Sequence, residues 1–118
     1  MKRRELAEQD VEFELSIYPE DIPVGGNAIA SGDTEYDSEV ENAIIRELEH
    51  NPWAWCTVKV TAKLGSFEGT DYLGCCSYKS EQDFKAGGYW DDMRAQALED
   101  LNIEIDAAAS LIDGLAIA

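Results

Sequence analysis

The longest patterned stretch of the chain is a pair of runs joined by a two-residue turn. In the first run, Trp53–Leu64, every second side chain is apolar: Ala54, Cys56, Val58, Val60, Ala62 and Leu64. Successive side chains of a strand point to opposite faces, so this alternation predicts a strand with one buried face. Gly65-Ser66 is typical of a turn, and Phe67–Tyr78 is predicted to return as the second strand of a hairpin. Such a hairpin commits the chain to a sheet, while Gly69 leaves its register open because a strand glycine often marks a bulge.

Two segments before the hairpin carry their own patterns. Strict alternation over Val11–Tyr18 predicts a half-buried strand. The sequence Ser38-x-x-Glu41 matches a capping box, which predicts that a helix begins there. Apolar residues then recur at helical spacing until Asn51-Pro52 ends the helix, and they are Val40, Ile44 and Leu48.

A longer helix is predicted after the hairpin. Gly87-Gly88 breaks the chain, and an apolar stripe follows at helical spacing, formed by Trp90, Met93, Ala97, Leu98, Leu101 and Ile105. The pattern extends to about Asp113, where Gly114 is expected to end the helix. The element order is then β-α-β-β-α. It predicts an α+β fold, a two-layer sandwich with a three-stranded, mainly antiparallel sheet and two helices.

The length of 118 residues is that of one domain, and no linker rich in Ser or Pro divides the chain. We therefore expect residues 1–118 to form a single domain. Within it we expect an N-terminal arm over 1–10, a flexible acidic loop over 19–36 and a C-terminal tail over 107–118. The loop contains two prolines and three glycines, which are Pro19, Pro23, Gly25, Gly26 and Gly32.

The charge balance narrows the range of partners. The chain has 25 acidic and 9 basic residues and a net charge of −16, and between Glu5 and Ile45 it has 12 acidic residues and no basic one. Like charges repel, which argues against direct binding to nucleic acid or to an anionic membrane. The expected partner is therefore basic.

Three features indicate a cytoplasmic location. The apolar runs are far shorter than the roughly 20 residues that a membrane-spanning helix needs. The basic start Met1–Arg4 is not followed by the apolar segment of a secretory signal. Three cysteines, two of them adjacent, do not make a disulfide framework and suit a reducing compartment.

Candidate metal and catalytic groups have simpler interpretations. The run Asp33-x-Glu35-x-Asp37-x-Glu39 is similar to a calcium loop, but the sixth position is Ser rather than Gly and the twelfth is Ile rather than Glu. His50 and Cys56 could form a catalytic pair, but the cysteine falls on the apolar face of its strand. We expect no enzyme activity, no metal and no cofactor.

The outward face of the hairpin gathers aromatic and basic residues, namely Trp53, Trp55, Lys59, Lys63, Tyr72 and Tyr78. Such faces stack single-stranded nucleic acid in several folds. Because the net charge opposes that role, we favour coverage of the aromatic side chains by the first helix, the N-terminal arm or a second subunit.

The acidic side chains of the N-terminal third form the predicted partner-binding surface. Glu12 and Glu14 lie on one face of their strand, about 6.8 Å apart at ~3.4 Å per residue. The net charge also exceeds the magnitude of roughly 2 to 8 that solubility needs in a small domain. The predicted surface consists of Glu12, Glu14, Glu20, Asp21, Asp33, Glu35, Asp37, Glu39 and Glu41, and a secondary patch consists of Asp91, Asp92, Glu99 and Asp100.

Two blocks of the chain resemble small, uncharacterised acidic proteins of phages and mobile elements. The first block is Trp53–Val60 (WAWCTVKV) followed by Tyr72–Tyr78 (YLGCCSY), and the second is Tyr89–Met93 with Ala97–Leu101. The resemblance covers about half the chain and implies no activity by itself. Very acidic phage proteins are often inhibitors of host defence, which suggests by analogy an anti-CRISPR or anti-restriction protein that imitates DNA.

The predicted function is therefore a non-enzymatic inhibitor that binds a nucleic-acid-binding defence complex in the host cytoplasm. The alternative is a structural or regulatory interaction module of a phage or mobile element whose acidity serves only solubility. We expect a monomer. A homodimer through the tail is the alternative, because Leu111, Ile112, Leu115 and Ile117 crowd the last residues.

Overall fold

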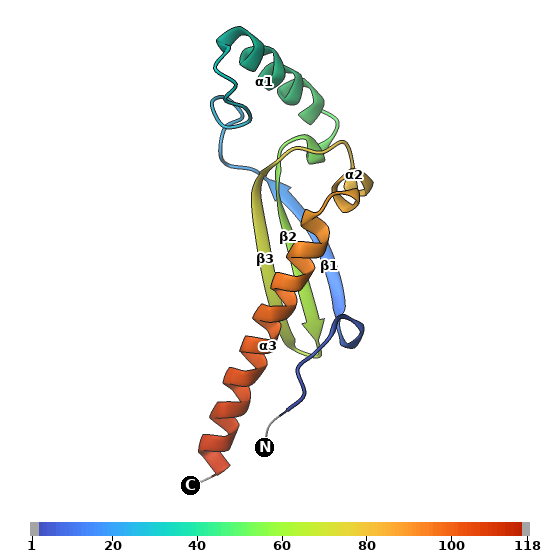
Figure 1. Cartoon of the computed structure of the whole chain (residues 1–118), viewed down its shortest axis with the longest axis vertical. Coiled ribbons are helices and arrows are strands. Elements are labelled where there is room, and N and C mark those ends of the chain that lie inside the picture. Colours follow the sequence, from blue (N-terminus) through green and yellow to red (C-terminus); the bar gives the residue numbers. More distant parts are fainter. Residues whose placement is uncertain (1–2, 117–118) are drawn as a thin grey trace. The chain divides into compact units, whose positions relative to one another are not determined.

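The sheet has three antiparallel strands in the order β1-β2-β3 (Figure 1). The computed structural model describes residues 3–116, and the strands are β1 (Glu12–Pro19), β2 (Cys56–Leu64) and β3 (Phe67–Cys76). The helices are α1 (Thr34–Leu48), α2 (Glu81–Ala86) and α3 (Tyr89–Ala116), with short 3-10 turns at Glu8–Asp10 and Pro52–Ala54. The predicted α+β class and the order β-α-β-β-α are confirmed, with α2 as a short addition.

The hairpin of β2 and β3 follows the alternation in the sequence. The inward-facing side chains of β2 are fully buried at Val58, Val60 and Ala62. The turn between the strands uses Gly65 at φ +60°, a backbone conformation that favours glycine. Burial of one strand face thus fixes which side of the hairpin faces the core.

The chain packs as two compact units, each made from segments distant in sequence. Unit 1 is Met1–Leu15, Val60–Asp71 and Asp91–Ala118, and unit 2 is Ser16–Lys59 and Tyr72–Trp90. The prediction of a single domain over 1–118 stays a prediction.

The core of unit 1 lies between α3 and β3. Met93, Ala97 and Leu101 of the predicted apolar stripe are buried. A Cβ atom on Gly69 would lie 2.2 Å from the backbone nitrogen of Leu101 and 2.3 Å from the carbonyl oxygen of Ala97. Gly69 is therefore the position where the strand and helix backbones touch, and this close approach accounts for the glycine.

The core of unit 2 contains an aromatic cluster built around Phe84 of α2. The Phe84 ring centroid lies 5.5 Å from that of Trp53, 5.1 Å from that of Tyr78 and 6.4 Å from that of Trp90. Ser80 caps α2 by accepting a hydrogen bond from the backbone N–H of Asp83 at 3.1 Å. Helix α2 thus covers part of the aromatic face for which the sequence suggested the first helix, the N-terminal arm or a second subunit.

Trp55 corrects one expectation from the alternating pattern. The 3-10 turn at Pro52–Ala54 precedes β2, so the strand begins only at Cys56. The Trp55 side chain is 4% exposed rather than outward, and its indole N–H donates to the carbonyl of Ile22 at 2.7 Å.

Two helix boundaries also differ from the predicted ones. Helix α1 begins at Thr34, because the Asp33 side chain caps it by accepting from the N–H of Tyr36 at 3.1 Å. The predicted loop over 19–36 is accordingly shortened to residues 20–33. Helix α3 continues through Gly114 to Ala116, since one glycine costs only about 1 kcal/mol in a helix.

The structure describes residues 3–10 of the predicted N-terminal arm and residues 107–116 of the predicted tail. Arg3 of the predicted arm donates from Nε to the Asp106 carboxylate at 2.9 Å, within unit 1. Of the apolar tail residues, Leu111 and Leu115 are 72% and 76% exposed, and Ile117 lies outside the described residues. Across residues 3–116 we find no helix with the length and apolar character needed to cross a bilayer.

Candidate functional site

The exposed carboxylates of α1 are the strongest concentration of uncompensated charge. Glu35 and Glu39 are exposed and lie one helical turn apart, and Asp33 caps the same helix. In the part of the chain that the structure describes, no ion pair includes an acidic residue between Glu20 and Glu41. Acidic residues near a helix N-terminus are stabilised by the helix dipole, which allows this density of charge without counter-charges.

Two acidic residues of α1 hold the loop over 20–33. Asp37 accepts hydrogen bonds from the backbone N–H and the hydroxyl of Ser31, the former at 3.2 Å. Glu41 accepts from the backbone N–H of Gly26. These carboxylates fix the path of the chain, so they shape the surface to which they belong.

Glu20 anchors the start of the same loop. Its carboxylate accepts from the Thr57 hydroxyl, from the backbone N–H of Cys75 at 3.1 Å and from that of Ile22 at 3.2 Å. The hydrogen bond from Thr57, followed by that from Cys75, lowers the pKa of Glu20 below its usual range. Glu20 is therefore ionised at neutral pH and ties the loop to β2 and β3.

Of the remaining predicted acidic residues, Asp21 is exposed in unit 2, and the other two belong to unit 1. Glu12 is exposed, whereas the Glu14 carboxylate pairs with the Lys63 ammonium at 2.9 Å. The nine residues of the predicted surface thus divide: Glu12 and Glu14 lie in unit 1, and the other seven, from Glu20 to Glu41, lie in unit 2.

The secondary patch lies wholly in unit 1 and is also partly engaged. Asp91 pairs with Arg94, and Asp100 accepts from the backbone N–H of Thr70 at 2.9 Å. Asp92 and Glu99 are exposed on α3. Half of this patch is thus engaged in contacts within unit 1.

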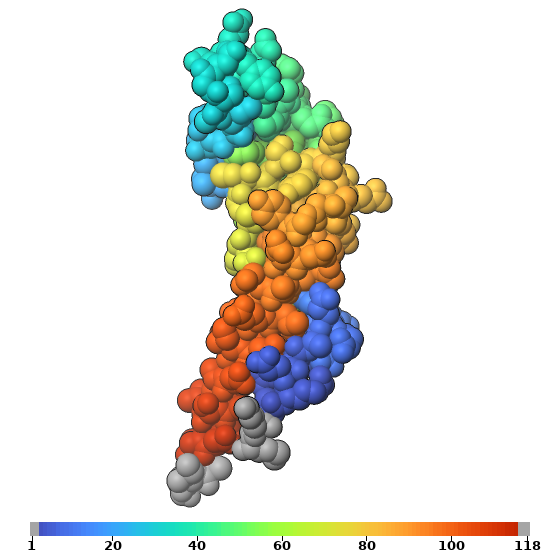
Figure 2. Space-filling model, viewed as in Figure 1, coloured from blue at the N-terminus to red at the C-terminus, as the bar shows by residue number. Residues whose placement is uncertain are grey.

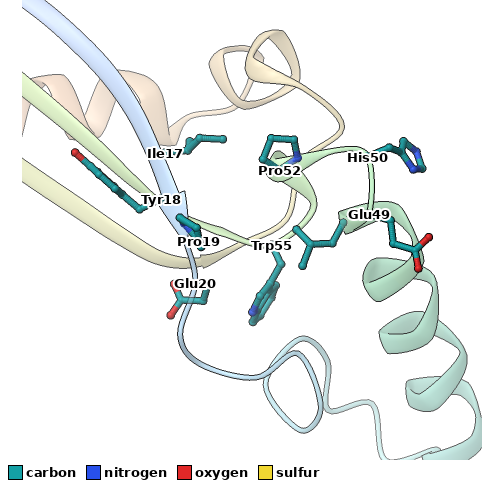
Figure 3. Close-up of a pocket in the computed structure, with 9 residues that line it drawn as sticks. Ile17, Tyr18, Pro19, Glu20, Glu49, His50, Pro52 and Trp55 are labelled. Atoms are coloured by element: carbon teal, nitrogen blue, oxygen red, sulfur yellow. The ribbon is translucent and has the colours of Figure 1, made fainter.

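A cleft of about 450 Å³ lies in unit 2 beside the end of β1 (Figure 3). Its walls are mostly apolar, with Tyr18 and Pro19 on one side and Pro52 on the other. Figure 3 shows the side chains of Glu20 and His50 at opposite sides of the cleft, pointing away from each other. These two groups therefore do not meet as an acid–base pair.

The thiols are poor nucleophiles where they are buried. Burial raises the pKa of Cys56 to about 12 and that of Cys76 to about 11. His50 is exposed and its Nε2 lies 3.3 Å from the carboxylate of Glu47. The His50–Cys56 pair weighed from the sequence thus has a thiol that stays protonated at neutral pH, and within residues 3–116 no cluster of His, Cys, Asp and Glu forms a metal site.

A second hollow, here called the α1 groove, was not foreseen from the sequence. It has a volume of about 730 Å³ and runs along α1 from Val40 to Glu47, with Ala54 and Tyr78 opposite. The helical spacing of Val40 and Ile44 indicated a face packed in a core. The structure instead leaves every residue of α1 at least partly exposed.

Comparison with models of known families, with curated proteins and with solved structures gives no match for this chain. The resemblance to small acidic phage proteins stays a prediction.

Proposed function

We propose that the protein is a non-enzymatic acidic inhibitor that binds a nucleic-acid-binding host defence complex, of the anti-CRISPR or anti-restriction kind, through α1 and the loop before it. The observation that carries this proposal is the density of carboxylates without a described ion pair on α1 and its cap residue. Asp33, Glu35, Asp37, Glu39 and Glu41 place five charges over about 12 Å of helix axis, or about one per 2.4 Å.

That spacing approaches the charge density of DNA. Duplex DNA carries about one negative charge per 1.7 Å of its axis, with both strands counted. A Lys- and Arg-lined groove that attracts DNA electrostatically will attract this helix for the same reason. The inhibitor would then occupy the groove and exclude the nucleic acid, with electrostatic steering raising the rate of encounter.

The contrast between the ion-paired acidic residues of unit 1 and the first two turns of α1 supports α1 as the contact surface. Arg3, Arg4, Lys63 and Arg94 all pair with acidic residues of unit 1. The exposed carboxylates Glu35 and Glu39 of α1 have no such pairs among the described residues, so their charge is available to a partner. A role limited to solubility would require no such concentration on one helix.

The test is a salt titration of the complex captured from a bacterial lysate on immobilised protein. Binding is measured between about 50 and 200 mM salt, with duplex DNA as competitor. We expect affinity to fall steeply with salt and DNA to release the complex. The variant Glu35→Gln/Glu39→Gln should bind roughly tenfold more weakly, at about 0.7 kcal/mol per lost charge.

The matched control is Glu104→Gln/Asp113→Gln, which removes the same charge from exposed positions of α3. It should bind as the wild type does. Equal weakening by both variants would show that net charge, rather than α1, determines binding. An affinity independent of salt and unaffected by DNA would remove the proposal and leave the interaction module as the better interpretation.

A further inference from the structure

We propose that the α1 groove is the docking site for a basic, amphipathic helix of the partner. This inference rests on the proposed function and deepens it, because it names the part of the partner that α1 receives. It starts from a helix whose apolar face is only partly covered. Val40 and Ile44 are half-buried and Ala43 is exposed, although their spacing is that of a packed face.

Most of α1 is exposed, and none of its residues is fully buried. In the space-filling view, atoms of α1 lie at the surface at the top (Figure 2). An amphipathic helix gains most of its stability from packing its apolar face against something else. Packing of a partner against the partly exposed apolar face of α1 would therefore stabilise the helix.

The dimensions of the groove suit a helix. From Val40 to Glu47 the groove follows two turns of α1, about 10 Å at 1.5 Å per residue. A helix laid in a groove engages it with side chains at positions i, i+3 or i+4, and i+7, which span the same two turns. The small Ala43 at the middle permits the close axis-to-axis approach of 8–10 Å that packed helices show.

The charges around the groove select a basic occupant. Its lining includes two carboxylates, those of Glu47 and Asp83, and one ammonium group, that of Lys79. Helix α1 carries Arg46 as its one basic residue over about four turns, at about 3.6 residues per turn, and its other charged residues are acidic. A second copy of this chain would bring the same acidic helix and be repelled, whereas lysine or arginine residues flanking an apolar stripe would pair with these edges.

The probe is a synthetic helical peptide of about five turns, with Leu at i, i+3, i+4 and i+7 and Lys elsewhere. Binding to the full chain is measured by fluorescence anisotropy. A matched peptide with Glu in place of Lys tests the role of charge. We expect the Lys peptide to bind and the Glu peptide to bind at least about tenfold more weakly.

The chain offers a matched pair of variants on neighbouring positions. Ile44→Asp places a charge in the groove, whereas Ile45→Asp places the same charge on a side chain that is 49% exposed and does not line it. The first should weaken binding of the Lys peptide by about tenfold or more, and the second by less than about twofold. Ile44 is not fully buried, so both variants are expected to fold, which circular dichroism checks.

Methyl chemical shifts of the wild-type protein locate the peptide-binding site without any variant. Addition of the Lys peptide should move the signals of Val40, Ala43 and Ile44 and leave that of Ile45 nearly unchanged. Equal loss of affinity in the two Asp variants, equal binding of the two peptides, or shifts confined to other residues would overturn the inference. If the same methyl signals moved with protein concentration in the absence of peptide, the occupant of the groove would be a second copy of this chain and the inference would be overturned.

Failure here is distinguishable from failure of the proposed function. If Glu35→Gln/Glu39→Gln weakens binding of the captured complex but Ile44→Asp does not, the acidic surface stands and the groove does not. If the complex is insensitive to salt and to the charge variants, the proposed function fails, whatever the peptide does.

Discussion

Replacing Gly69 with alanine tests how closely α3 approaches the sheet in unit 1. The added Cβ would lie 2.2 Å from the nitrogen of Leu101 and 2.3 Å from the oxygen of Ala97, both of them backbone atoms of a helix. Ordinary contact requires about 3.5 Å, so helix and strand must separate by roughly 1.2 Å. Overpacking costs typically 1–3 kcal/mol. We expect the upper end, about 3 kcal/mol, because neither backbone can rotate aside.

Separation would also stretch the hydrogen bond from the Thr70 N–H to Asp100, which is 2.9 Å long. For a chain of this size about 3 kcal/mol corresponds to a fall in Tm of roughly 12 °C. Urea unfolding followed by circular dichroism measures the loss. The control is Gly114→Ala, in the same helix with nothing within 4 Å of the added Cβ, which should stabilise the protein by up to about 1 kcal/mol. A Gly69→Ala protein within about 0.5 kcal/mol of the wild type would refute the close approach.

Three further predictions address the loop anchor, the thiols and the tail. Because folding lowers the pKa of Glu20, its carboxylate stabilises the fold above the usual glutamate pKa of about 4.3, and this contribution is lost as the pH falls below that value. Glu20→Gln should therefore lower the urea midpoint at pH 7 and differ less from the wild type at pH 3; a constant difference would contradict the assignment. Iodoacetamide at about pH 8 should label Cys75 and spare Cys56 and Cys76 until denaturant is added, as mass spectrometry will show; labelling of all three in the native protein would count against their burial. Full-length protein should sediment as a monomer, as should a chain lacking 110–118, and a full-length dimer that truncation dissociates would favour the homodimer instead.

Periodicity in the sequence was sufficient for the elements whose burial follows a simple repeat. The alternation over β2 and the stripe on α3 both predicted buried side chains that the structure confirms at Val58, Met93 and Leu101. In each case the repeat of the side chains matches the repeat of the backbone, so local pattern and tertiary burial agree. The same reasoning predicted the α+β class.

The sequence-based prediction was wrong at the start of α1 and at Trp55, where two local sequence patterns indicated different structures. The capping box at Ser38 lies inside α1, since Asp33 supplies an equally suitable cap and acidic residues favour the first turn. Trp55 was predicted to point outward because the alternation was continued through the turn at Pro52–Ala54. The buried indole N–H of Trp55 donates to the carbonyl of Ile22, far away in sequence, and no local pattern encodes such a contact.

The sequence predicted which acidic residues belong to the candidate site, but it did not predict how their side chains are arranged. The sequence identified the acidic residues from Glu20 to Glu41, yet it could not separate those that hold the loop from those that face solvent. That difference depends on which backbone N–H groups come near each carboxylate, as with Gly26 and Glu41. The α1 groove was missed for a related reason, because an amphipathic pattern shows that a face is apolar without showing whether anything covers it.

The way the loop over 20–33 is held has a consequence for how the surface behaves in different media. Its anchors are contacts of about 3 Å between carboxylates and N–H groups, at Glu20 and Asp37 among others. Mobile ions screen charges over about 10 Å at 0.1 M salt and cannot enter between atoms already in contact. The shape presented to a partner should thus persist in concentrated buffers, and a change of ionic strength would alter the long-range attraction while leaving the contact surface intact.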